Sequence, residues 1–339
     1  MVASGSPVQG PVLVTGAAGF IGRALVDRLL AEGVPTVAAV RRPPPQPASG
    51  HPPTRAKVVA VGDIGPHTDW RGPSRAWTAW YIWPRACLAA RVHVMRDRAA
   101  DPLAEFRKVN VDGTLALARQ AAEAGVRRFI FVSSVKVNGE STAPGRPIAA
   151  DDVPAPVDAY GISKLEAERG LLALTAQTGM ELVIIRPVLV YGPGVKANVR
   201  NMMVWLSRGV PLPLGATGNR RSMVALDNLT DMIATCMSHP AAAGQVFLVS
   251  DGEDLSTTDL LRRMGVALGK PARLLPVPAA WLDGAARLLG KRAVAQRLCG
   301  SLQVDIEKTR SLLGWTPLVT VDDALRKTAR HFLAQRRND

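Results

Sequence analysis

The chain has 339 residues, of which 47% are hydrophobic, and its 42 lysines and arginines exceed its 28 aspartates and glutamates to give a formal net charge of +14. This length and composition exclude a disordered chain and suit one large domain or two fused ones around a buried core. No apolar run reaches the roughly 18 residues of a membrane span, and residues 1–10 lack the pattern of a signal peptide. We therefore expect a cytoplasmic protein without stable membrane insertion.

The first part of the chain predicts a strand, a turn, a helix and a second strand. Val12–Thr15 is a short β-branched apolar run, and a glycine-rich turn follows it. Phe20–Ala31 carries apolar residues at helical spacing and ends close to Gly33, which is a natural helix stop. Thr36–Val40 is a second apolar run. This βαβ order implies a parallel sheet.

The alternation of strands and helices continues after a proline-rich loop. Further strands are predicted at residues 57–61, 128–133 and 181–186, and helices at residues 102–125 and 159–178. This pattern predicts an α/β fold with a Rossmann-type, doubly wound parallel sheet.

Beyond about residue 190, glycine and proline punctuate shorter elements, which suits a smaller C-terminal domain. We assign residues 1–190 and about 222–255 to the sheet domain, and residues 191–221 and 256–339 to the smaller domain.

The glycine-rich turn after the first strand predicts a dinucleotide site. Gly16, Gly19 and Gly22 are spaced GxxGxxG between a strand and a helix. Such glycines allow a tight turn, a close approach of the backbone to a pyrophosphate, and close packing of the helix on the strand. The free N–H groups and the dipole of the helix N-terminus then favour the anion.

The end of the second strand bears on the choice between NAD and NADP. An acidic residue there would bond the ribose 2′-hydroxyl, whereas an arginine accommodates a 2′-phosphate. The strand ends in Arg41 and Arg42, and Arg41 lies 19 residues after Gly22. NADP is favoured and NAD stays possible, because both arginines are also compatible with solvated loop positions. Asp63 and Ile64, which end the third strand, are candidate adenine contacts or ordinary turn residues.

A serine, a tyrosine and a lysine form the predicted catalytic group. Ser133 and Ser134 end a strand, and Tyr160 and Lys164 stand at i and i+4 on one helix face. A phenol with a pKa near 10 is a poor base at neutral pH, and a neighbouring ammonium lowers that pKa. The phenol then exchanges a proton with a substrate hydroxyl while hydride moves to or from nicotinamide, and a serine hydroxyl holds the same oxygen.

At these residues the chain resembles the extended short-chain dehydrogenase/reductase family over nearly its whole length. The matching pieces are TGAAGFIG (residues 15–22), VNVDGT (109–114), FVSSVKVNGE (131–140), YGISKLEAE (160–168), IRPVLVYGPG (185–194), NRRSMVALDNL (219–229) and LGWTP (313–317). The resemblance implies that the sheet domain binds NAD(P) and the smaller domain binds a nucleotide sugar.

The resemblance also implies roles for individual residues. Tyr160 is the acid/base, Lys164 its modulator and a ribose ligand, and Ser134 the partner of the substrate oxygen. The implied cofactor contacts are Gly16, Gly19, Phe20, Ile21, Gly22, Arg41, Arg42, Asp63, Ile64, Leu88, Ala89, Ala90, Asn110, Lys164 and Pro187. Asn110 supports the lysine through water. The implied substrate contacts are Ser133, Lys136, Asn198 and Arg220, the last two at a diphosphate. Two helices near residues 103–125 and 159–178 imply a homodimer through a four-helix bundle.

Within the family, the segments SSVKVNGE, VKAN, PLPLG and NRRS look most like those of UDP-sugar 4-epimerases and of 4-ketoreductases in 6-deoxy-N-acetylhexosamine synthesis. Most 4-epimerases carry a tyrosine in place of Asn138 and an acid in place of Arg41. Both departures favour a UDP-4-keto-sugar 4-reductase that uses dissociable NADPH in polysaccharide precursor synthesis. The alternatives are a UDP-glucose or UDP-N-acetylglucosamine 4-epimerase and a catalytically impaired NADP-binding regulator. The sugar and its C4 stereochemistry stay open.

Residues 71–87 depart from the family pattern, which reads roughly ALxGVDxVVHLAA at this strand. Four of the seven tryptophans fall between residues 70 and 83. Tryptophan has a single codon, so part of the underlying DNA sequence can be deduced. If the reading frame is shifted so that codons start on the third bases of this stretch, it can encode Asp, Val, His or Tyr, Leu or Met, and Ala, in the order of the family strand. The stretch is therefore either a frameshifted copy of the family strand, with the frame restored at residues 88–90, or a divergent aromatic strand over residues 78–83.

The cysteines and the basic charge indicate no further class of function. Cys87, Cys236 and Cys299 lie far apart without a CxxC pair, so neither a disulfide framework nor a metal site is predicted. The positive charge would suit nucleic acid, but the charges are scattered without a run of five or six. We expect no nucleic-acid partner and relate the charge to an anionic cofactor and a UDP-sugar substrate.

Overall fold

The structure is a computed structural model that describes residues 11–42, 56–70, 79–82, 100–288, 296 and 298–338. Its largest unit is a seven-stranded parallel sheet in the order β3-β2-β1-β4-β5-β6-β9. The strands are β1 (Val12–Thr15), β2 (Thr36–Val40), β3 (Lys57–Ala60), β4 (Ala79–Ile82), β5 (Arg128–Val132), β6 (Glu181–Pro187) and β9 (Val246–Val249). The strand order reverses beside β1, which is where doubly wound sheets bind ligands. The predicted Rossmann-type sheet is confirmed.

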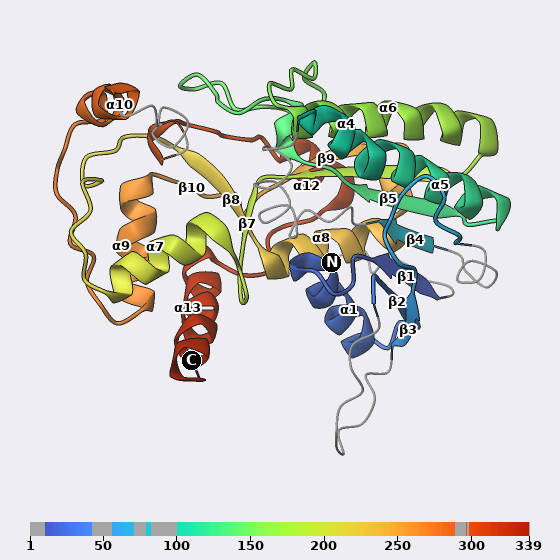
Figure 1. The fold of residues 1–339 in the computed structure, drawn as a ribbon, viewed down its shortest axis with the longest axis horizontal. Coiled ribbons are helices and arrows are strands. Elements are labelled where there is room, and N and C mark those ends of the chain that lie inside the picture. Colours follow the sequence, from blue (N-terminus) through green and yellow to red (C-terminus); the bar gives the residue numbers. More distant parts are fainter. Residues whose placement is uncertain are drawn as a thin grey trace.

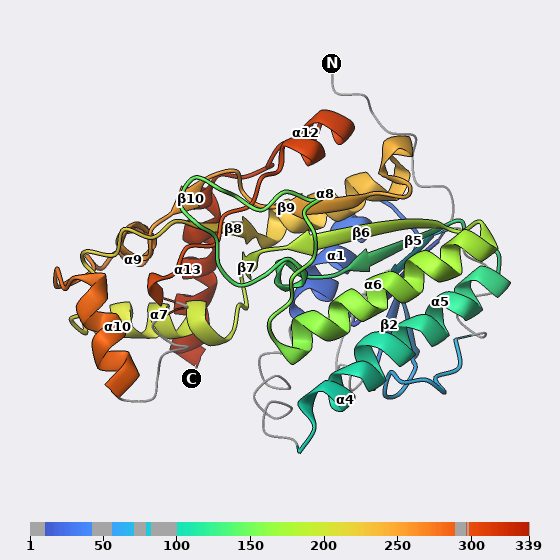
Figure 2. The ribbon, with the colours of Figure 1, turned by 90° about the horizontal axis from the view of Figure 1, so that it is seen from above.

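Helices cover both faces of this sheet (Figures 1 and 2). One face carries α1 (Phe20–Ala31) and α8 (Leu226–Ser238), and the other carries α4 (Pro102–Arg107), α5 (Thr114–Glu123) and α6 (Ala159–Thr178). Alternation along the strands explains the two cores. In β1, Val12 and Val14 belong to the core with α1 and α8, whereas Leu13 belongs to the core with α5 and α6.

The helix expected over residues 102–125 is interrupted by a π-helical segment. The chain runs as α4, then η1 (Lys108–Gly113), then α5. A π turn accommodates an extra residue and is frequent at functional sites. Here it brings the buried side chain of Asn110 against α6. The prediction of one continuous helix was wrong in the middle, because apolar spacing does not reveal this local insertion.

The smaller part of the molecule has its own sheet and core. β7 (Leu189–Tyr191), β8 (Arg221–Ala225) and β10 (Asp254–Leu255) form a three-stranded sheet in the order β10-β8-β7. Three helices, α7 (Ala197–Ser207), α9 (Thr257–Ala267) and α13 (Val321–Asn338), pack on one another around the second core. The short η2 (Val135–Val137), η3 (Pro240–Ala242), α10 (Ala279–Leu288) and α12 (Glu307–Leu313) complete the described elements.

The fourth strand of the large sheet is the place where the sequence is unusual. β4 lies between β1 and β5, with Leu13 beside Trp80 and Trp80 beside Phe129. The rest of residues 71–87, and the predicted cofactor contacts at residues 88–90, lie outside the described residues. The frameshift hypothesis therefore stays a prediction. What the structure adds is that residues 79–82 form a strand of the parallel sheet. In the described part of the chain, no helix combines the length and apolar character needed to cross a bilayer.

Candidate active site

The glycine-rich turn has the geometry of a cradle for a pyrophosphate. Gly16 has a φ of +63°, a left-handed conformation that favours glycine, and its carbonyl accepts a 2.7 Å hydrogen bond from the amide of Gly19. A Cβ on Gly22 would stand 2.2 Å from the same carbonyl oxygen, so the helix could not approach the turn. α1 begins at Phe20, directly after the turn. The residues therefore fit a dinucleotide whose diphosphate meets the helix N-terminus.

The residues that end β2 and β3 are joined by an ion pair. Both guanidinium nitrogens of Arg41 contact the carboxylate of Asp63, with Nε–Oδ1 at 2.6 Å and Nη2–Oδ2 at 2.8 Å. The two side chains are 49% and 66% exposed, so the pair contributes little to stability. The ion pair instead fixes the position of the Arg41 guanidinium at the carboxyl edge of the sheet. Arg42 beside it is exposed.

Two of the three predicted catalytic residues line one cavity. Ser134 follows β5 and Tyr160 stands in the first turn of α6, and both line a cavity of about 430 Å³. The start of α6 is fixed by Asp158, whose Oδ1 accepts a 2.6 Å hydrogen bond from the amide of Gly161. Such an N-cap sets where the helix begins and hence where Tyr160 lies.

Lys164 lies one helical turn after Tyr160, beneath the cavity. It is fully buried, and its Nζ donates a 2.8 Å hydrogen bond to the carbonyl of Val132. The same nitrogen is 4.4 Å from the ring centroid of Phe131 and 6.0 Å from that of Tyr160. Burial lowers the pKa of Lys164 to about 7, against a smaller opposing effect of Glu168. The ammonium is therefore poised to change charge near neutral pH beside the phenol.

Two further contacts hold the tyrosine. The edge of Phe106 faces its ring, with the centroids 5.6 Å apart and the planes at 67°. Asn110 donates from Nδ2 to the hydroxyl of Ser163 at 3.0 Å, and that hydroxyl donates to the backbone carbonyl of Tyr160 at 2.8 Å. The direct partner of Asn110 is thus Ser163, and the water-mediated support of Lys164 that the family resemblance implies stays a prediction.

A buried ion pair ties α6 to β6. Arg186 contacts Glu168 through Nη2 at 2.6 Å and Nε at 3.0 Å, and the side chains are 5% and 2% exposed. Asn138 accepts a 3.1 Å hydrogen bond from the same guanidinium and donates to the carbonyl of Asp152 at 3.4 Å. Asn138 does not line the cavity, so the asparagine at this position has a structural role here.

The opposite wall of the cavity is formed by the smaller domain and is mainly apolar. Its lining side chains there include Val199, Met202, Met223, Leu260, Leu298 and Leu302. This wall carries two cations, Lys196 and Arg221, and Nη1 of Arg221 donates a 3.0 Å hydrogen bond to the carbonyl of Gly300. Burial lowers the pKa of the Arg221 guanidinium. Arg220, the arginine expected here, is exposed and does not line the cavity.

Lys136 forms a charged cluster at the edge of the cavity. Its Nζ contacts Glu140 Oε1 at 2.5 Å and also the carboxylate of Asp158. Although burial disfavours the charged ammonium, these two carboxylates together keep the pKa of Lys136 above its ordinary value. Lys136 and Glu140 both line the cavity. Since Asp158 also caps α6, the cluster joins a cavity residue to the helix that carries Tyr160.

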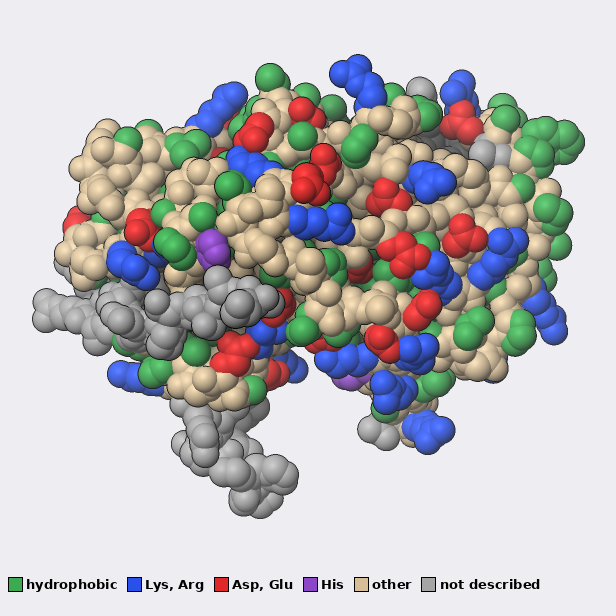
Figure 3. Space-filling view, turned by 180° about the vertical axis from the view of Figure 1, so that it is seen from behind, with side chains coloured by type: hydrophobic (Ala, Val, Ile, Leu, Met, Phe, Trp, Pro, Cys, Tyr) green, Lys and Arg blue, Asp and Glu red, His purple; other side chains and the backbone are tan. Residues whose placement is uncertain are grey.

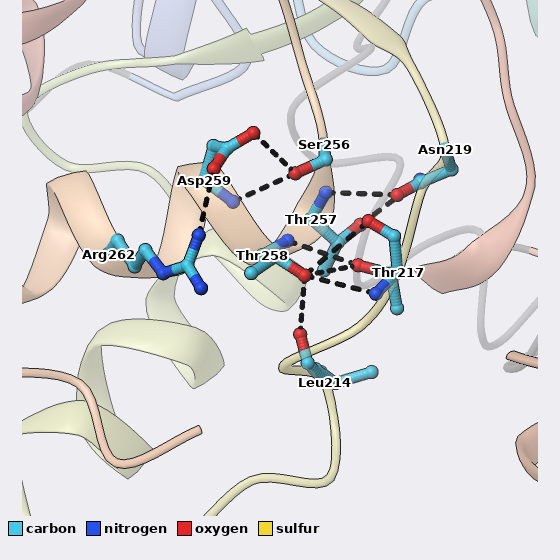
Figure 4. A network of polar contacts seen from close by, with 8 residues as sticks. All are labelled: Leu214, Thr217, Asn219, Ser256, Thr257, Thr258, Asp259 and Arg262. Carbon is cyan, nitrogen blue, oxygen red and sulfur yellow. Dashed lines mark hydrogen bonds and ion pairs between the residues drawn. The ribbon is translucent and has the colours of Figure 1, made fainter. Parts of the chain in front are cut away.

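A polar network fixes the apolar wall (Figure 4). Thr258 donates from Oγ1 to the carbonyl of Leu214 at 2.6 Å and accepts from the amide of Thr217 at 3.1 Å. Asn219 accepts from the amide of Thr257 at 3.0 Å and donates to the carbonyl of Gly300 at 3.0 Å. The loop before β8, the start of α9 and the segment at Gly300 are thus held together around Arg221.

The sequence predicted part of this cavity and missed part of it. The predicted residues that line it are Phe20, Ile21, Ser133, Ser134, Lys136, Tyr160, Pro187 and Asn198. Ile64 lies elsewhere, where its Cγ2 would be 3.0 Å from a Cβ built on Gly113. Lining residues that the sequence did not indicate include Glu140, Arg221, Thr257 and Gln296. The motif NRRS could have indicated Arg221. It contains two adjacent arginines, Arg220 and Arg221, and adjacent residues in a strand face opposite sides, so only one of them can face the cavity.

Comparison with known proteins identifies the family. The model of the "NAD dependent epimerase/dehydratase family" matches residues 12–250. A UDP-glucose 4-epimerase of Vibrio cholerae is 46% identical over 323 residues, which cover 95% of each chain. An N-acetyl-α-D-glucosaminyl-diphospho-ditrans,octacis-undecaprenol 4-epimerase of Escherichia coli O157:H7 is 27% identical and covers 97% of each chain.

Solved structures share the fold over nearly the whole chain. A UDP-glucose 4-epimerase of Thermotoga maritima with UDP-glucose has a TM-score of 0.72 at 21% identity, covering 96% of this chain and 99% of that one. A UDP-glucuronic acid 4-epimerase of Bacillus cereus with NAD has a TM-score of 0.72 at 20% identity, covering 97% of this chain and 98% of that one. The chain therefore belongs to the NAD-dependent epimerase/dehydratase family and is an NAD(P)-dependent enzyme of the short-chain dehydrogenase/reductase type.

Proposed function

We propose that this enzyme moves a hydride between a nicotinamide cofactor and C4 of a UDP-linked sugar. The observation that carries the proposal is one cavity lined by Ser134 and Tyr160, by Phe20 and Ile21 at the start of α1, and by Arg221. A cavity with a proton-transfer group, the start of a cofactor cradle and a partly buried cation suits a substrate that has both a hydroxyl and a diphosphate. The relatives and solved structures that act on UDP-sugars support the same substrate class.

The chemistry follows from the side chains around C4. Tyr160 takes the proton of the C4 hydroxyl in the oxidative direction and returns it in the reductive one, and the Ser134 hydroxyl holds the same oxygen. The ammonium of Lys164, whose Nζ lies 6.0 Å from the Tyr160 ring centroid, stabilises the phenolate form. Hydride acceptance and donation are the chemistry that a nicotinamide supplies when bound. The residues that would hold it are Gly16, Gly19, Gly22 and Lys164.

The first candidate for the net reaction is 4-epimerisation. The relative that is 46% identical over 95% of both chains is a UDP-glucose 4-epimerase. Asn138, whose difference from the usual tyrosine argued against an epimerase, is engaged with Arg186 and does not line the cavity. An apolar wall with few directional contacts leaves the 4-keto sugar free to turn its other face to the returning hydride. In this candidate the enzyme retains NAD.

The second candidate is reduction of a UDP-4-keto sugar by NADPH. Arg41 favours it, because the end of β2 presents a guanidinium, tethered to Asp63, where NAD enzymes place a carboxylate. A dissociable NADPH matches a net reductase, which releases its oxidised cofactor in every turnover.

One purified sample separates the candidates. Cofactor released from the denatured enzyme is identified by mass spectrometry, and the enzyme is assayed with UDP-glucose, with UDP-N-acetylglucosamine, and with NADPH plus UDP-4-keto-6-deoxy-N-acetylglucosamine. Retained NAD with interconversion of the C4 epimers supports the epimerase. Substrate-dependent NADPH consumption without retained cofactor supports the reductase. If neither reaction exceeds that of the Tyr160→Phe variant, the proposed function is wrong.

We also propose that the enzyme is a homodimer in which α5 and α6 of two copies form a four-helix bundle. Leu172 on α6 is 48% exposed, which is unusual for a leucine on a helix that is otherwise well packed. Light scattering during size-exclusion chromatography measures the mass directly. We expect the wild type to have twice the mass of Leu172→Asp, and a wild-type monomer would refute the dimer.

A further inference from the structure

The molecule has a second hollow, which the proposed reaction does not use. Its volume is about 320 Å³, and its lining residues are Arg200 and Val204 on α7, Arg208 directly after α7, and Arg336 on α13. Arg200, Val204 and Arg208 stand at i, i+4 and i+8, the spacing of one helix face. Val199 and Met202, which line the active-site cavity, lie on another face of the same helix. The hollow is therefore separate from the catalytic site, and its lining contains no carboxylate.

All three arginines are exposed, and two of them have no partner in the described part of the chain. Within the described part of the chain, Arg200 and Arg208 form no ion pair or hydrogen bond through their guanidinium groups, whereas Arg107 pairs with Glu166 through two bonds. Arg336 donates from Nη1 to the hydroxyl of Ser207 at 2.5 Å. Three adjacent guanidinium groups repel one another, and the nearest available compensation is an anion.

The orientation of Arg336 is fixed on the protein side. Its guanidinium carbon lies 5.8 Å from the ring centroid of Phe332, and its bond to Ser207 comes from the last residue of α7. A guanidinium that is held in this way loses less conformational freedom when it binds a ligand. Figure 3 shows several Lys and Arg side chains at the lower right, where α13 ends.

We propose that Arg200, Arg208 and Arg336 form an anion site for a small ligand with two or three linked phosphates. Guanidinium groups bind phosphate oxygens through paired, charge-assisted hydrogen bonds, and three of them match more than one phosphate. The volume of about 320 Å³ lies at the lower end of the roughly 300–1,000 Å³ of small-molecule sites. The net charge of +14 steers such an anion toward the protein.

The test is calorimetric titration with inorganic tripolyphosphate. The enzyme is first saturated with nicotinamide cofactor and UDP, which fill the phosphate positions of the active-site cavity. We expect one additional site, and the double variant Arg200→Gln/Arg208→Gln should bind tripolyphosphate at least about tenfold more weakly. Neither of these side chains has a partner in the described chain, so their replacement leaves the fold intact, which the melting temperature checks.

The matched control is Arg119→Gln, an exposed arginine on α5 that likewise has no described partner. It removes one positive charge at a distant position, against two in the double variant, and should bind tripolyphosphate as the wild type does. The proposal is overturned if the saturated enzyme binds no tripolyphosphate, if the double variant binds as tightly as the wild type, or if Arg119→Gln weakens binding as much as a single substitution in the hollow.

Discussion

The two walls of the active-site cavity are built in different ways. The wall from the sheet domain carries the reacting groups, and these come from two short segments, the end of β5 with Ser134 and the first turns of α6 with Tyr160 and Lys164. The wall from the smaller domain is mainly apolar and comes from α7, β8, α9 and from Gln296, Leu298 and Leu302. The first wall thus depends on local spacing and the second on tertiary assembly.

This difference predicts how each wall responds to substitution. On the sheet-domain wall, the proposed proton transfer depends on a single side chain, so its loss should abolish turnover. On the apolar wall, many contacts share the binding, so individual losses should change affinity more than rate. Substitutions on the two walls therefore test whether chemistry and specificity are separated in this enzyme.

The largest effect is expected for Tyr160→Phe. It removes the proton-transfer hydroxyl and keeps the ring that packs on Phe106. General acid–base catalysis contributes about 10²–10⁴-fold, so we expect kcat to fall by roughly 10³-fold. Turnover is measured with whichever substrate the assays under Proposed function show to react. Cofactor binding is measured by the fluorescence of the reduced nicotinamide. A variant with more than a tenth of wild-type kcat would show that another group transfers the proton.

Lys164→Met should separate activity from stability on the same wall. The folded state lowers the pKa of Lys164 from 10.5 to about 7 because the ammonium is buried. Between these values the unfolded chain binds more protons than the folded chain, so the free energy of unfolding rises with pH across this window. At pH 7 and below, the wild type bears the full cost of the buried charge.

We therefore expect Lys164→Met to be inactive and yet more stable than the wild type at pH 7, by about 3 kcal/mol. Part of the gain is offset by the lost hydrogen bond to Val132. The advantage of the variant should shrink as the pH approaches 10, because the amine, already neutral in the folded chain, then begins to lose its proton in the unfolded chain as well. Urea unfolding of both cofactor-free proteins at pH 7 and 9.5 measures it. An unchanged difference between these pH values would contradict the assignment.

The sequence predicted the first wall well because its information is local. Tyr160 and Lys164 are one helical turn apart, Ser134 ends a strand, and the three glycines form one turn, so each motif defines its own geometry. Asn110 was a harder case. Its position in a π turn changes which neighbour it meets, and the spacing VNVDGT does not reveal that turn.

The second wall was predicted less well because its residues come from distant segments. Gln296 and Thr257 meet only after α9 and the segment at residue 300 have packed on the loop before β8. Arg220 and Arg221 are adjacent in the sequence, and a shift of one residue in a strand moves a side chain to the opposite face. Composition and periodicity identify an arginine-bearing strand but not its register against the cavity.

Arg221→Gln tests that register directly. If Arg221 is the cation that meets the substrate diphosphate, its loss should raise KM about tenfold or more and change kcat by less, since the bond is present in ground and transition states alike. Arg220→Gln is the matched control, because the adjacent arginine is exposed and outside the cavity. A larger KM effect for Arg220→Gln would restore the assignment made from the sequence.

The smallest effect is expected from the helix caps, which occur on both walls. Ser256 caps α9, where its Oγ accepts a 2.9 Å hydrogen bond from the amide of Asp259 (Figure 4), and Asp158 caps α6 in the same manner. Loss of such a cap costs about 1 kcal/mol. Ser256→Ala and Asp158→Ala should therefore both lower the melting temperature by a few degrees.

Their kinetic effects should differ, and this makes the pair the most direct comparison of the two walls. Asp158→Ala frays the helix turn that carries Tyr160 and also removes a carboxylate partner of Lys136. We expect kcat to fall several-fold, because a small displacement of a proton-transfer group is costly. Ser256→Ala loosens the start of α9, whose Thr257 only lines the cavity, so kcat should stay unchanged. Equal losses of kcat in both variants would mean that the apolar wall also positions the reacting groups.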